Sequence, residues 1–119
     1  MANLGNLYQP SIMEQAQAGN FRAIAYWLNS ELVAQQIYAQ VKAAHPGCLR
    51  VLVEFHRPPN RDRLTRFICH RLWCLNSDVI EGVQIVARCI NQARPLWQQS
   101  IRITTPASRQ RRQQLRQPL

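Results

Sequence analysis

The chain has 119 residues, with fifteen Lys and Arg against six Asp and Glu, so its formal net charge is +9. This length fits one domain and is too short to enclose a large cofactor pocket beside a hydrophobic core. No apolar run approaches the roughly 20 residues of a membrane span, and the N-terminus lacks the charged and apolar regions of a signal peptide, which predicts a cytoplasmic protein.

The first predicted elements are a short helix and an amphipathic helix. Residues 1–19 are expected to form an arm and a short helix that Ser11 caps, because Glu14 follows three residues later as in a capping box. Residues 20–36 show apolar side chains three or four positions apart, which is typical of a helix with one buried face. That face is predicted to comprise Phe21, Ile24, Leu28 and Leu32.

Two hairpins and a second helix follow. Alternation of polar and apolar residues predicts strands over 37–42 and 49–55. A helix is expected from about 61 to 76, and two more strands over 79–89 and 96–103. The apolar face of this second helix is predicted to comprise Leu64, Ile68, Leu72 and Leu75.

The order helix, hairpin, helix, hairpin is an internal repeat of an αββ unit, over 20–55 and 61–103, within one domain of residues 20–103. Two such units can pair into a four-stranded antiparallel sheet with both helices on one face, which buries the apolar side of every element. The predicted fold is therefore α+β, a ferredoxin-like arrangement with its first strand moved to the end. Residues 104–119 show no apolar period and are rich in Arg and Gln, which predicts a basic, disordered tail.

The sequence offers no recognisable catalytic or metal site. The cysteines show no CxxC pair and no ligand spacing, so we expect reduced, metal-free and largely buried thiols. Adjacent Cys69 and His70 project in different directions from a helix and cannot form a nucleophile pair. The carboxylates lie singly, and there is no GxGxxG or phosphate loop. We therefore expect a protein that is not an enzyme and uses no cofactor. The four cysteines are Cys48, Cys69, Cys74 and Cys89.

Cations gather on the second helix and in the tail. On the helix, the side opposite the apolar face carries Arg63, Arg66, His70 and Trp73. An exposed indole beside guanidinium groups can stack on a nucleobase or hold an apolar partner residue, whereas the commoner case is a solvated helix face. The tail has four cations and no acid, a composition found in arms that contact phosphates and also in tails that serve solubility alone. Its cations are Arg109, Arg111, Arg112 and Arg116.

The outward face of the predicted sheet offers a second surface. Basic and amide side chains there suit nucleic acid, but RNA-recognition sheets carry two or three aromatic residues, and here Tyr38 is nearly alone. Leu52 and Val86 instead indicate that a protein partner or a second copy covers part of this face, beside Arg88.

Two hypotheses follow. In the first, the chain is a non-enzymatic module that binds nucleic acid, RNA or single strands rather than duplex, through the phosphate backbone with its tail and second helix. In the alternative, it is a protein-interaction adaptor or a homo-oligomer that assembles through the sheet face. The positive charge favours the first hypothesis, and the scarcity of aromatic residues on the sheet favours the second.

Two stretches of the sequence carry a family resemblance. One includes Ala18-Gly19-Asn20, Trp27-Leu28-Asn29 and Arg57-Pro58-Pro59, and the other includes Arg66-Phe67-Ile68, Leu75-Asn76-Ser77 and Gly82-Val83. Over roughly residues 14–103 the chain resembles small cyanobacterial proteins and domains of uncharacterised function. The resemblance implies a cyanobacterial source and brings no catalytic or binding residue with it.

Overall fold

A computed structural model describes residues 11–116, so the predicted arm over 1–10 lies outside the described residues. The elements, in chain order, are α1 (Ile12–Gln17), α2 (Phe21–Leu32), the 3-10 turn η2 (Val33–Gln35), β1 (Ile37–His45), β2 (Cys48–Phe55), α3 (Arg61–Leu75), β3 (Gly82–Cys89), β4 (Trp97–Arg102) and α4 (Pro106–Arg116). Among the described helices, none has the length and apolar character needed to cross a membrane.

The first three helices begin where the sequence supplies a capping side chain. Ser11, Asn20 and Asn60 each accept, at 3.0 Å, a hydrogen bond from the backbone N–H three residues later. Asn76 closes α3 in the left-handed conformation, with φ at 52°, which Asn adopts more readily than most residues. The predicted cap at Ser11 and the predicted helix over 61–76 are therefore confirmed.

The sheet is mixed, and its strands lie in the order β1-β2-β3-β4. The outer pairs β1/β2 and β3/β4 are antiparallel, but the central pair β2/β3 is parallel. The α+β class is confirmed, whereas the prediction of an antiparallel sheet is wrong at the centre. A ferredoxin-like arrangement with its first strand moved to the end would pair the last strand with β2. Here β3 takes that place, and α3 forms the crossover that a parallel pair requires.

The burial of the two C-terminal strands explains this order. The inward residues of β3 are fully buried and outward Val86 is half-buried, whereas β4 alternates between half-buried and exposed positions. A strand with apolar residues on both faces suits the centre of a sheet, and a polar strand suits its edge. The inward residues of β3 are Val83, Ile85 and Ala87, each 0% exposed.

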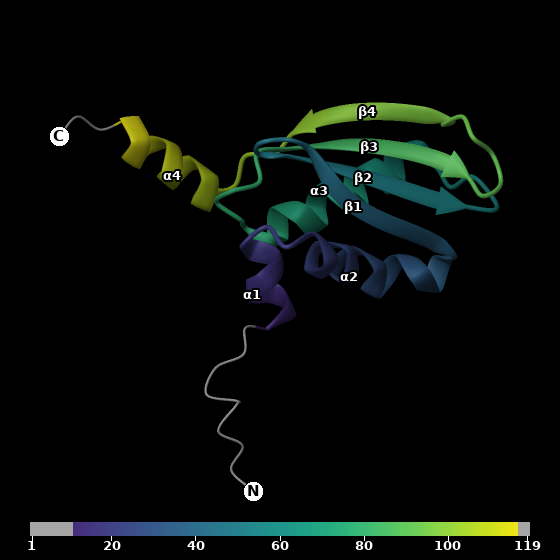
Figure 1. Cartoon of the computed structure of the whole chain (residues 1–119), viewed down its shortest axis with the longest axis horizontal. Helices are drawn as coiled ribbons and strands as arrows, with labels where there is room; N and C mark the ends of the chain where they lie inside the picture. The colour runs from purple at the N-terminus through teal and green to yellow at the C-terminus, as the bar shows by residue number, and fades with distance from the viewer. Residues whose placement is uncertain (1–10, 117–119) are drawn as a thin grey trace, which may run out of the picture.

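The core lies between the sheet and the helices α1, α2 and α3, which share one side of it (Figure 1). The predicted apolar face of α3 is buried throughout. On α2, Ile24, Leu28 and Leu32 are buried as predicted, but Phe21 is 42% exposed. Phe21 is the first residue of the helix, and Ala23 takes the buried position in that turn. No described helix covers the other side of the sheet.

The C-terminal segment corrects the prediction of a disordered tail over 104–119, because Pro106–Arg116 is helical. Thr105 and Ser108 cap the start of α4 reciprocally: the Thr105 N–H donates to Ser108 Oγ at 2.9 Å, and the Ser108 N–H donates to Thr105 Oγ1 at 3.1 Å. Pro106 occupies the first helical position, where its fixed φ suits a helix. Residues 117–119 lie outside the described residues.

The start of α4 is also bound to the end of α3. The Ala107 N–H donates to Asn76 Oδ1 at 3.0 Å, and the Thr105 hydroxyl donates to the Ser77 carbonyl at 3.2 Å. Thr105 and Ser108 are each 1% exposed. Residues predicted to contribute nothing to packing therefore fix α4 at one end of the domain, from which the helix projects (Figure 1).

Candidate functional site

The outer face of α3 carries the side chains that the sequence assigned to it. Arg63, Arg66, His70 and Trp73 are all exposed, and 48% of Trp73 is accessible. Trp73 is exposed because its neighbour Leu72 takes the buried position in the last turn of α3. A large apolar side chain left in solvent beside cations is the first feature that points to a ligand.

A groove between α3 and α4 brings Trp73 together with the C-terminal helix. Its volume is about 310 Å³. Trp73 and Pro106 supply apolar surface, Arg109 supplies a cation, and no carboxylate among residues 11–116 lines the groove. We call this the Trp73 groove, and its lining residues are Trp73, Thr104, Pro106, Arg109, Gln110 and Gln113.

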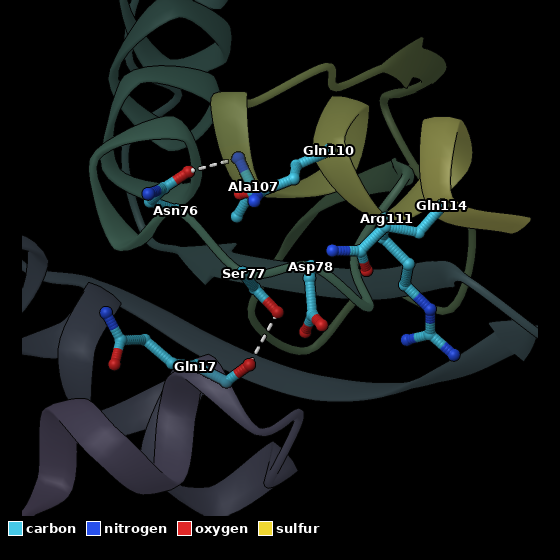
Figure 2. Close-up of a pocket in the computed structure, with 8 residues that line it drawn as sticks. All are labelled: Gln17, Asn76, Ser77, Asp78, Ala107, Gln110, Arg111 and Gln114. Atoms are coloured by element: carbon cyan, nitrogen blue, oxygen red, sulfur yellow. Dashed lines mark hydrogen bonds between the residues drawn. The ribbon is translucent and has the colours of Figure 1, made fainter. Parts of the chain in front are cut away.

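A second hollow against α4, of about 380 Å³, combines groups of opposite charge (Figure 2). Asp78 and Arg111 both line it, beside the hydrogen bond from Ala107 to Asn76. The Asp78 carboxylate would repel a phosphate that entered this hollow. This hollow is therefore a poorer anion site than the Trp73 groove.

The remaining predicted cations are dispersed. Arg112 Nε donates to Glu81 Oε1 at 3.0 Å, which neutralises one of the four arginines of α4. Arg116 is exposed at the last residue of α4. Arg63 lies at the other end of α3 from Trp73, about 15 Å away along the axis at 1.5 Å per residue. The structure thus brings Trp73 and Arg109 together and leaves Arg63, Arg111 and Arg112 in other surroundings.

The sequence interpretation missed the contribution of α4 to this groove. Gln110 and Gln113 line it because Pro106–Arg116 is a helix, and the signal for that helix was present. Thr105 followed by Pro106 is a helix-start pattern, with a capping residue before proline at the first position. The Arg- and Gln-rich composition of residues 104–119 favoured a prediction of disorder instead.

The four cysteines are free in the structure, and their burial differs from the prediction. Cys74 is exposed, and its Sγ lies 3.4 Å from Nε2 of His70, because residues four apart share one helix face. The other three cysteines are half-buried. Desolvation raises the pKa of the Cys69 thiol above its ordinary value, which lowers its thiolate fraction at neutral pH.

The predicted interaction surface lies on the open face of the sheet. Tyr38 is opposite Glu54, which is opposite Arg88, and the Arg88 guanidinium meets the Glu54 carboxylate at 2.8 Å. In the next row, Leu52 and Val86 are paired and half-buried. All four predicted residues therefore share one face, which no described helix covers.

Within residues 11–116, no group of three His, Cys, Asp or Glu side chains is placed to hold a metal ion. Comparison with protein-family models, curated proteins and solved structures found no match to the chain. The resemblance to a cyanobacterial family therefore stays a prediction.

Proposed function

We propose that the chain is a non-enzymatic module that binds single-stranded nucleic acid, RNA in particular, at the Trp73 groove. The observation that carries this proposal is an indole, 48% exposed, in a groove that the described residues line with an arginine and two amides and without a carboxylate. A base stacked on such an indole contributes about 1–3 kcal/mol, and Arg109 can pair with the adjacent phosphate. The amides of Gln110 and Gln113 offer donors and acceptors to a base edge.

Single strands fit this groove better than a duplex does. In a duplex the base faces are stacked on one another, so the Trp73 indole has no face to contact unless the helix opens. A loop or single strand presents its bases without that cost. The dispersed arginines of α4 contact phosphates without reading sequence, which adds affinity and salt dependence.

The ion pair between Arg112 and Glu81 limits the electrostatic contribution of α4. Arg109, Arg111 and Arg116 remain for phosphates, while Arg112 already has a carboxylate partner at 3.0 Å. At about 0.7 per phosphate on single strands, three contacts predict that α4 contributes about 2 to the slope of log affinity against log salt.

The alternative is an adaptor or homo-oligomer that assembles through the open sheet face. It is supported by Leu52 and Val86, which lie side by side on a face that no described element covers. These two residues form a small apolar patch, far below the several hundred Å² that mark a protein interface. The Trp73 groove therefore carries the leading proposal.

Fluorescence anisotropy with the full-length protein tests the proposal. The probes are a fluorescein-labelled 12-nucleotide oligouridylate and a labelled 12-base-pair RNA duplex, each titrated at several salt concentrations. We expect tighter binding of the single strand and an affinity that falls with salt. Absence of salt-sensitive binding near physiological ionic strength would remove the proposal and leave the adaptor alternative.

A further inference from the structure

Two cations face each other directly on the open side of the sheet. Lys42 of β1 and Arg50 of β2 are register partners in the antiparallel pair, and both side chains are exposed. Like charges directly opposite on one sheet face destabilise the sheet, because their side chains lie close together. A pair kept at that cost points to an anion that binds between the two groups.

The described chain supplies no counter-ion to this pair. Arg50 Nε donates to Gln84 Oε1 at 2.8 Å, which fixes the guanidinium but brings no charge. Glu54 is the only carboxylate on this face of the described strands, and it pairs with Arg88 at 2.8 Å. Lys42 makes no hydrogen bond or ion pair within residues 11–116. Both cations are therefore available to a ligand.

An apolar floor lies beside the cation pair. A hollow of about 150 Å³ is lined by Gln40, Lys42, Arg50, Leu52 and Val86. This volume is too small for an enclosed small-molecule site, which typically measures about 300–1,000 Å³. It suits one group of an extended ligand that crosses the sheet, with an apolar face against Leu52 and Val86 and an anionic group between the cations.

We infer that the open sheet face is a second contact for the same nucleic-acid strand, with a phosphate between Lys42 and Arg50 and a base over Leu52 and Val86. This inference rests on the function proposed for the Trp73 groove. The charge of the face supports it against a homodimer, because two copies packed on this face would bring like cations together. The cations are Lys42, Arg50, Arg88 and Arg102, against Glu54 alone.

The two surfaces meet at the end of β4. Arg102 is exposed on the open face as the last residue of β4, and Thr104 lines the Trp73 groove. Two residues of extended chain span at most about 7 Å. A single strand that leaves the groove at Thr104 therefore reaches Arg102 within about one nucleotide step, and Arg50 lies on β2, two strands further across the sheet at about 4.8 Å per strand.

The test is a salt titration of a fluorescein-labelled 15-nucleotide oligouridylate with the full chain and its variants. The double variant Lys42→Gln/Arg50→Gln loses two phosphate contacts, so its slope of log affinity against log salt should be lower by about 1.4, at about 0.7 per contact. The matched control is Arg22→Gln/Arg94→Gln, which removes the same charge at exposed sites that line neither surface. The control should keep the parental slope.

Each outcome supports or overturns the inference. A double variant with the same slope as the control overturns it, and if Trp73→Ala weakens binding in that experiment, the proposed function survives. If the parent protein does not bind RNA at all, the proposed function fails and the inference fails with it. A labelled poly-glutamate peptide tests the other occupant. If it binds the parent more tightly than RNA does, and the double variant but not the control loses this peptide binding, the face binds an acidic protein and the inference is overturned. Circular dichroism should show that the double variant melts no lower than the parent.

Discussion

Trp73 of α3 and Arg109 of α4 line the same groove, although they belong to helices that the sequence pattern did not connect. The groove depends on the start of α4, where Thr105 and Ser108 are buried and hydrogen-bonded to each other. The capped start of α4 thus places Arg109, which can bind a phosphate, in the same groove as Trp73, which can stack on a base. The proposed binding function follows from this arrangement rather than from net charge alone.

Arg109 and Arg112 should differ in their effect on RNA binding, although both lie on α4. Arg109→Gln removes a cation of the Trp73 groove, so the slope of log affinity against log salt should fall by about 0.7. Arg112→Gln removes a cation that Glu81 already neutralises at 3.0 Å, so it should leave the slope nearly unchanged. Anisotropy titrations between about 50 and 300 mM salt measure the slope for each variant and separate the two. Equal effects would contradict the assignment of Arg109 to the groove.

Thr105→Ala should destabilise the domain. The substitution removes the cap of α4 and the hydrogen bond to the Ser77 carbonyl, and loss of an N-cap costs about 0.5–2 kcal/mol. Thermal unfolding measures the change. The control is Ser100→Ala on the exposed side of β4, where an effect within about 0.5 kcal/mol is expected. Removal of residues 104–119 should likewise lower stability, and a truncated chain that melts with the parent would contradict the docking of α4.

Lys42→Glu should raise stability while it lowers RNA affinity. The substitution turns a like-charge pair with Arg50 into an opposite-charge pair, which contributes roughly 0.2–1 kcal/mol across a sheet. The same change places a carboxylate where a phosphate is proposed to bind. Thermal unfolding and anisotropy on one preparation give both values. A variant that loses stability and affinity together would indicate a structural role for Lys42 instead.

Local patterns in the sequence predicted the elements better than their arrangement. The buried stripe of α3 and the cap at Ser11 depend on residues within one or two turns, so periodicity and capping chemistry were sufficient. The parallel pairing of β2 with β3 depends on which strand of the second hairpin buries more apolar surface, which is a comparison between distant segments. The hairpin pattern alone did not indicate whether β3 or β4 pairs with β2.

Only the local part of the candidate site was predictable from the sequence. Helical spacing placed Trp73 on the exposed side of α3, and its exposure is observed. The groove needs α4, whose position depends on hydrogen bonds from Thr105 and Ala107 to the end of α3. Those contacts are tertiary, and the Arg- and Gln-rich composition of residues 104–119 suggested disorder instead.

The affinity of Trp73→Ala for a single-stranded oligouridylate is the most direct test of the central claim. Loss of one stacking contact of about 1–3 kcal/mol predicts roughly 5- to 150-fold weaker binding, with the salt slope unchanged because the indole releases no counterion. Trp73→Phe should retain part of the affinity, and Tyr26→Ala, at an aromatic residue 64% exposed on α2, should retain all of it. If Trp73→Ala binds RNA as tightly as the parent protein, the Trp73 groove is not the binding site.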